Sequence, residues 1–140
     1  MPTSTRLDDL PTWLLSQASM RAHRILRRSL GEIGASGYDY RVLSALADLG
    51  ELTHAQIGSA TSLDRRDVSD AVRSLESDGL LIRGPHPSDA RMTLVTISDE
   101  GAGRLADLDR TLGEIQAEVL GPLTGPERRE LARLLGKLQP

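Results

Sequence analysis

The chain has 140 residues, 39% of them hydrophobic and 26% charged, which is the composition of one folded domain and excludes a disordered chain. It contains no cysteine, which excludes disulfide bonds, thiolate metal sites and thiol redox chemistry. A net charge of −3 argues against a protein that coats nucleic acid regardless of sequence, whereas a sequence-specific regulator needs only a local basic face.

Three helices are predicted in the first half of the chain. Between residues 13 and 30 apolar residues recur every three or four positions, and the arginines between them are expected to face solvent. Glycines then interrupt the chain before a second helix over residues 38–49, and a short link leads to a third over residues 53–60. Pairs that resemble helix-opening capping boxes are Ser36 with Asp39, Thr53 with Gln56 and Thr124 with Glu127.

A fourth helix and a β-hairpin follow. Asp64 is the expected N-cap of the fourth helix, which ends at Gly79. After Gly79 the apolar period changes, and residues 80–83 and 92–97 are expected to form two short strands around a turn rich in proline and glycine.

Two further helices are predicted after the hairpin. The first begins at Ser98 and carries apolar residues alternately three and four positions apart, a spacing typical of helices packed along their length. Gly121 and Pro122 end it, and a last helix with a leucine stripe follows to Leu138. The predicted fold is therefore mainly α with a small β-hairpin, arranged as a winged helix-turn-helix.

The fourth helix is the candidate for DNA recognition. Its apolar residues occupy one face, and Arg66, Ser69, Asp70 and Arg73 occupy the other, with Arg65 beside them in the first turn. Arginine can donate two hydrogen bonds to guanine in the major groove. The alternative is an ordinary solvated helix face, and residues 64–91 hold six acidic residues against five arginines, so a basic patch requires separation of charge by face. The tight-turn helix pair favours the DNA-binding interpretation.

Several runs of residues resemble the MarR family of bacterial transcriptional regulators. They are residues 64–69 (DRRDVS), 75–81 (LESDGLL), Arg83, 87–91 (PSDAR) and 95–101 (VTISDEG). The resemblance is specific from about residue 36 to residue 101, and outside that span only the order and lengths of the helices agree. Ala90 departs from the family, which often has a basic residue there, and Ser98 replaces a common threonine.

The resemblance implies one domain over residues 1–140, with a winged helix-turn-helix lobe at 36–98 and dimerisation helices at 10–35 and 99–138. It implies a homodimer that binds a palindromic operator in double-stranded DNA without a cofactor, and acts as a repressor, although activation stays open. The residues expected to serve DNA binding, with Asp89 orienting Arg91 in the wing, are Arg65, Arg66, Ser69, Asp70, Arg73, Asp89 and Arg91. The residues expected at the dimer interface are Leu105, Leu108, Leu112, Ile115, Val119, Leu131, Leu134 and Leu135.

Members of the family commonly release DNA when a small aromatic or anionic compound binds. The residues expected to form such a site, with ordinary packing as the alternative for each, are Trp13, Met20, His23, Tyr38, Tyr40 and Arg41.

Other classes of function have less support. The sequence has no phosphate-binding loop, nucleophile elbow or zinc-protease motif, and its three histidines lie on separate elements, so we expect neither an enzyme nor a metal site. No apolar run is long enough for a membrane span or a signal peptide, and we expect a cytoplasmic protein. The remaining competitor is a winged helix that binds another protein and not DNA, which the acidic net charge mildly favours.

Overall fold

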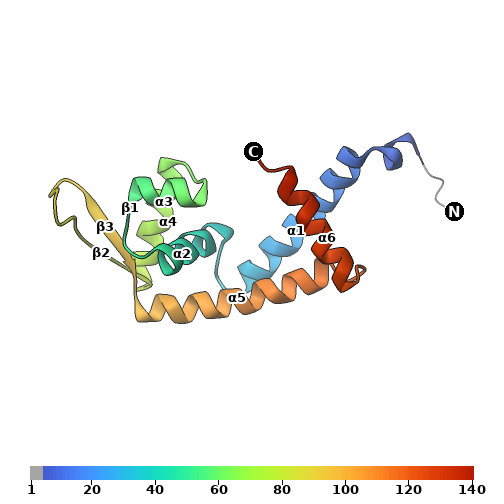
Figure 1. Cartoon of the computed structure of the whole chain (residues 1–140). Helices are drawn as coiled ribbons and strands as arrows, with labels where there is room; N and C mark the ends of the chain where they lie inside the picture. The colour runs from blue at the N-terminus through green and yellow to red at the C-terminus, as the bar shows by residue number, and fades with distance from the viewer. Residues whose placement is uncertain (1–4) are drawn as a thin grey trace. The chain divides into compact units, whose positions relative to one another are not determined.

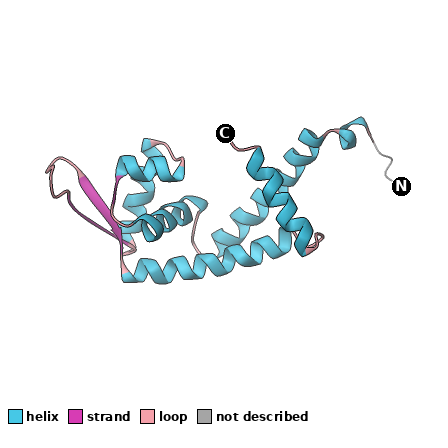
Figure 2. Ribbon diagram, in the orientation of Figure 1, coloured by secondary structure: helices cyan, strands magenta, loops and turns pink. Residues whose placement is uncertain are grey.

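The computed structural model describes residues 5–140 of the chain (Figure 1). Its regular elements, in chain order, are a 3-10 helix Arg6–Asp9, α1 Pro11–Glu32, α2 Gly37–Leu49, β1 Leu52–Thr53, α3 His54–Thr61, α4 Arg65–Ser77, β2 Leu81–Pro85, β3 Thr93–Ile97, α5 Asp99–Val119 and α6 Gly125–Lys137. The predicted class, mainly α with a β-hairpin, is confirmed, as Figure 2 shows by colour. Within the described residues no helix is both long and apolar enough to cross a membrane.

The chain forms two compact units, whose boundaries fall inside α1 and α5. The central unit comprises Leu30–Thr111, and the terminal unit comprises the chain up to Ser29 together with Leu112–Pro140. The central unit is wider than the lobe predicted at residues 36–98, because it includes the end of α1 and the first half of α5. The assignment of functional roles to these boundaries remains a prediction.

Side-chain caps explain where the helices of the central unit begin. Ser36 accepts a hydrogen bond from the Asp39 amide at 3.3 Å, and the Asp39 carboxylate accepts one from the Ser36 amide at 3.0 Å. Thr53 and Gln56 form the same reciprocal pair before α3. Asp64 accepts from the Asp67 amide at 2.8 Å and so opens α4. These caps satisfy amide groups that have no partner inside the helix, as the sequence predicted.

The core of the central unit lies between α2, α3, α4 and the sheet. Leu43, Ile57 and Val68 are almost completely buried and come from three different helices. Between α3 and α4, Ser62 adopts a left-handed conformation with φ of 58°, which makes the turn tight. Gly58 suits the same packing: a Cβ there would lie 3.3 Å from the carbonyl oxygen of Leu63, so the turn would have to move by a few tenths of an ångström to accommodate it. The two helices therefore form the predicted helix-turn-helix pair.

The sheet has three antiparallel strands in the order β1-β3-β2. β2 and β3 form the predicted hairpin, in which Leu81 pairs with Ile97 and Pro85 pairs with Thr93. The strand β1 was not predicted. It is only two residues long and owes its conformation to pairing with β3, so it leaves no periodic signal in the sequence.

Ser98 fixes the hairpin between the end of α4 and the start of α5. Its amide donates to the Leu80 carbonyl oxygen at 3.1 Å, and its hydroxyl donates to the Gly79 carbonyl oxygen at 2.6 Å. The same hydroxyl accepts from the Gly101 amide at 3.0 Å, as an N-cap does. Ser98 therefore performs the capping role expected of the threonine it replaces.

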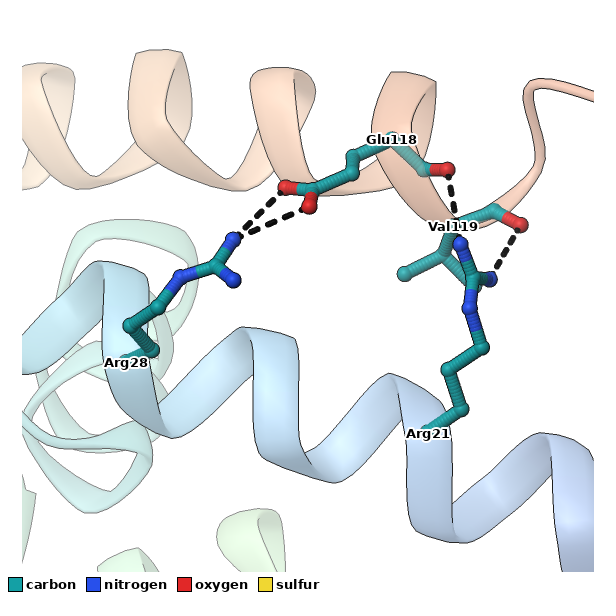
Figure 3. A network of polar contacts seen from close by, with 4 residues as sticks. All are labelled: Arg21, Arg28, Glu118 and Val119. Carbon is teal, nitrogen blue, oxygen red and sulfur yellow. Dashed lines mark hydrogen bonds and ion pairs between the residues drawn. The ribbon is translucent and has the colours of Figure 1, made fainter.

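In the terminal unit, α1 is joined by hydrogen bonds to the end of α5 (Figure 3). The Arg21 guanidinium donates to the carbonyl oxygens of Val119 and Glu118 at 3.1 and 3.5 Å. The Arg28 guanidinium donates to both carboxylate oxygens of Glu118 at 2.9 and 3.0 Å. Both arginines are exposed, as the sequence predicted, and each also donates hydrogen bonds to the end of α5.

Candidate nucleic-acid interface

The helix α4 separates its apolar and polar residues by face, as the sequence predicted. Val68, Ala71, Val72 and Leu75 are buried against the central unit. On the opposite face the side chains of Arg66 and Arg73 are 90% and 76% exposed. Arg65 and Asp70 are also exposed, and Ser69 is half-buried. All five predicted recognition residues thus belong to one exposed helix or its edge.

Asp70 lies between the two exposed arginines. Its carboxylate is 4.0 Å from Nε of Arg66 and 3.9 Å from Nη1 of Arg73. These distances exceed those of hydrogen bonds, and exposed ion pairs of this kind contribute little to stability. The guanidinium groups therefore keep their donors for an external partner, and Asp70 reduces the positive potential at the centre of the face.

The tip of the wing is a turn organised by Asp89. Its carboxylate accepts hydrogen bonds from the Arg91 amide at 3.0 Å and from the Arg91 side chain at 3.3 Å. The backbone hydrogen bond, followed by the side-chain one, lowers the pKa of Asp89. The Arg91 side chain is 91% exposed, so the predicted pair is formed and its cation points into solvent.

An ion pair that the sequence analysis missed joins the wing to α4. Arg83 on β2 donates to both carboxylate oxygens of Glu76 on α4, at 2.6 and 2.8 Å. Hydrogen bonding to Arg83 lowers the pKa of Glu76, and Glu76 in turn raises the pKa of Arg83. No spacing rule identifies a pair in which one member ends a helix and the other enters the next strand. The bidentate geometry restrains the base of the wing relative to α4.

The residues predicted to bind a ligand are divided between the two units. Trp13, Met20 and His23 belong to the terminal unit, and Tyr38, Tyr40 and Arg41 belong to the central unit. Within the central unit, Tyr40 and Arg41 line a recess of about 380 Å³ together with residues of α2 and α3. The Tyr40 hydroxyl donates to the Asp109 carboxylate at 2.9 Å, and this hydrogen bond is the main reason that the pKa of Tyr40 is raised.

Two of the predicted dimer-interface residues are buried within this chain, and the assignment of the set to a dimer interface stays a prediction. Leu108 is 0% and Ile115 is 3% exposed, so both are covered by their own chain and offer no apolar area to a partner. The heptad-like spacing was correct as a packing signal but could not say which neighbour the seam meets. The other residues of the set retain surface: Leu134 is exposed, and those half-buried are Leu105, Leu112, Val119, Leu131 and Leu135.

Among residues 5–140 no three histidine, aspartate or glutamate side chains gather as a metal site would require.

A family model described as "MarR family" matches residues 34–92 of the chain. This span includes the helix-turn-helix pair, β2 and the tip of the wing.

Curated relatives of the chain are described as HTH-type transcriptional regulators. The uncharacterized regulator Mb0904 of Mycobacterium bovis is 32% identical over 114 residues, which are 81% of this chain and 80% of that protein. The repressor NicR of Pseudomonas putida is 26% identical over 144 residues, covering 98% of this chain and 91% of NicR. The chain spans only 65% of the length of a third relative, the uncharacterized regulator YdgJ of Bacillus subtilis, to which it is 26% identical.

Solved structures agree with these relatives. A probable transcriptional regulator from Pseudomonas aeruginosa is 30% identical with a TM-score of 0.84, and 96% of this chain and 100% of that chain are covered. The PcaV transcriptional regulator from Streptomyces coelicolor, solved in complex with its natural ligand, is 25% identical with a TM-score of 0.80. The match covers 98% of this chain and 96% of the PcaV chain. With a helix-turn-helix pair, a wing and relatives of this kind, the chain belongs to the MarR family of transcriptional regulators.

Proposed function

We propose that this chain is a homodimeric repressor that binds a palindromic operator in double-stranded DNA. In each subunit α4 enters the major groove and the wing tip at Asp89 and Arg91 reaches the adjacent minor groove. The observation that carries this proposal is the exposed polar face of α4, on which Arg66 and Arg73 extend into solvent without a hydrogen-bonded acidic partner. A face of this kind supplies the donors that guanine edges accept.

Charge distribution supports specific rather than indiscriminate binding. The chain carries a net charge of −3, so its affinity for arbitrary duplex DNA should be low. The side chains of Arg66, Arg73 and Arg91 are exposed on α4 and the wing, although acidic residues of the same segment limit the positive potential there. Base contacts by a few arginines can then decide where the protein binds, while acidic regions elsewhere limit non-specific association.

The first test is binding to the DNA upstream of the chain's own gene, measured by fluorescence anisotropy at several salt concentrations. We expect this DNA to bind more tightly than a scrambled duplex of equal length, and log Ka to fall linearly with log salt by about 0.9 for each phosphate contacted. Benzoate and 4-hydroxybenzoate, added at millimolar concentration, serve as probes for release. Binding that is equal for both duplexes, or absent at low salt, would favour the protein-binding alternative.

A small aromatic or anionic effector is part of the proposal. Tyr40 and Arg41 offer an aromatic wall and a guanidinium at one recess of the central unit, which is the chemistry that an aromatic carboxylate requires. PcaV, the 25% identical relative, was solved with its natural ligand. We therefore propose that this chain is also regulated by a ligand of that general class.

Dimerisation is proposed because apolar side chains remain uncovered at both ends of the chain. Residues with large exposed apolar surface in the terminal unit are Leu7, Leu10, Trp13, Leu14, Leu15, Met20, Leu134 and Leu138. Surface of this kind on several elements marks an interaction site in a soluble protein. A second copy of the chain is the occupant that a palindromic operator requires.

We predict that the chain sediments as a dimer at micromolar concentration and that Leu134→Glu shifts it to the monomer. The reason is that Leu134 is 45% exposed, and a carboxylate placed there would be buried without a partner on association. Arg129→Glu is the matched control, because position 129 lies on the other side of α6 and its charge change is larger. Sedimentation velocity measures both. A monomeric wild-type chain, or equal dissociation of both variants, would contradict the prediction.

A further inference from the structure

A recess of about 440 Å³ lies between α3 and the start of α4, and no residue pattern in the sequence marks it as a site. Its lining residues are His54, Ala55, Gly58, Ser59, Leu63, Arg65 and Val68. Leu63 and Val68 are buried and give the recess an apolar floor. The polar groups around it are the imidazole of His54, the hydroxyl of Ser59 and the guanidinium of Arg65, all of which can donate hydrogen bonds.

The recess exists because one face of α3 carries only small side chains. Ala55, Gly58 and Ser59 are spaced by three and four positions and therefore lie next to one another on the helix surface. Gly58 also lets α3 approach the turn before α4 closely, as its 3.3 Å virtual Cβ contact with Leu63 indicates. A larger residue at any of these three positions would fill the space.

The position of the recess links it to the candidate DNA interface. Arg65 lines the recess and is immediately followed by Arg66, the first predicted base-contacting residue of α4. When a helix enters the major groove by its first turns, groups beside those turns meet the phosphates that border the groove. His54 and Ser59 line the recess beside those turns, so a phosphate, and not a base edge, is the part of a bound duplex that we expect them to meet.

The charges that face His54 are mainly positive. Arg83 approaches it from β2 and is itself held by Glu76 of α4, and Arg65 lies on the rim of the recess. No carboxylate lines the recess, and α3, β1 and β3 contain no acidic residue. The neighbouring segments do carry acidic residues, but these are not among the residues that line the recess: Asp39, Asp48, Glu51, Asp64, Asp67 and Asp70. Burial, and then the charge of Arg83, lower the pKa of His54 and so favour its neutral imidazole in the free protein.

We propose that this recess binds one phosphate of the DNA backbone through His54, Ser59 and Arg65, and that His54 takes up a proton when DNA binds. This inference rests on the proposed function. The phosphate supplies the negative charge that the surroundings of His54 lack, and a nearby anion favours the imidazolium form. His54 is then neutral in the free protein and protonated in the complex. Because DNA binding takes up a proton, the affinity for DNA increases as the pH falls towards the ordinary range of histidine titration.

The test compares operator affinity between pH 5.5 and 8.0 at constant ionic strength, in buffers without inorganic phosphate, which would compete for the recess. For the wild-type dimer we expect affinity to rise as the pH falls, by at most about tenfold per pH unit for each protonated subunit. His54→Gln should bind the operator more weakly than the wild type at every pH, because one phosphate ligand is changed, and should lose the gain in affinity at low pH. His86→Gln in the wing and His23→Gln in α1 are matched controls and should keep it.

A second measurement needs no variant. Titration of the His54 ring protons by NMR, in the free chain and in the operator complex, should give a higher pKa in the complex. An unchanged or lower pKa in the complex, or the same pH dependence in His54→Gln as in wild type, would overturn the inference while leaving the proposed function intact. Failure of the wild-type chain to bind any operator at any pH would overturn both.

Discussion

Replacing Gly101 with alanine is expected to destabilise the central unit by about 3 kcal/mol, the upper part of the usual range for overpacking. A Cβ at this position would lie 2.1 Å from the Leu80 carbonyl oxygen and 2.8 Å from Cγ1 of Ile97. The first neighbour is backbone, and it already accepts a hydrogen bond from the Ser98 amide. Relieving the clash would therefore break the contact that fixes the wing between α4 and α5.

Thermal unfolding followed by far-ultraviolet circular dichroism measures this effect. A loss of this size should lower the melting temperature by roughly 12–24 °C in a unit of this length. Gly103→Ala is the matched control, since it lies two residues further along the same helix and a Cβ there meets nothing within 4 Å. It should be neutral or stabilising by up to about 1 kcal/mol, because alanine favours the helix. Equal melting temperatures for the two variants would contradict the packing described for Gly101.

The features that the sequence predicted are those that depend on neighbours in the chain. The capping pair Thr53 and Gln56 is three residues apart, so the sequence alone specifies both partners. The faces of α4 follow from helical periodicity in the same way, and the burial of Val68 against the exposure of Arg66 confirms the predicted orientation.

The features that escaped prediction depend on partners distant in the chain or on small side chains. Periodicity placed Leu108 on an apolar seam but could not distinguish burial within one chain from burial against a second. The bonds from Arg21 to the end of α5 join residues almost a hundred positions apart. The recess at His54 exists because α3 has no large side chain on one face. An alanine, a glycine and a serine there match no sequence motif that indicates a site.

The wing combines both kinds of feature. The turn at Asp89 is local, and the sequence predicted its pairing with Arg91, which the structure places at 3.3 Å. The attachment of the wing to α4 instead involves partners that the sequence did not connect, the Ser98–Leu80 hydrogen bond and the Glu76–Arg83 ion pair. The contacts at the wing tip should therefore follow the local motif, while these longer-range contacts restrain the base of the wing relative to α4.

The largest functional effects are expected from Arg66→Ala and Arg73→Ala, each of which should weaken operator binding by about 1–3 kcal/mol if the lost contact is bidentate to guanine. Neither change should affect folding, because both side chains are at least three-quarters exposed and their nearest carboxylate oxygens lie 4.0 and 3.9 Å away. Arg110→Ala is the matched control: it also removes an exposed arginine paired three residues away, with Asp107, but from α5. Fluorescence anisotropy on the operator and on a scrambled duplex gives the affinities.

The pattern of losses assigns each arginine its contact. An arginine that binds a base should lose affinity for the operator and little for the scrambled duplex, whereas one that binds phosphate should lose both equally and reduce the salt slope by about 0.9. Asp70→Asn removes the carboxylate between the two arginines and should strengthen binding to the scrambled duplex more than to the operator. That result would support the proposal that this face discriminates through two cations around one anion, because the anion would penalise every duplex whose groove does not offer it a donor. If operator affinity is unchanged in both arginine variants, the proposal that α4 binds in the major groove is contradicted.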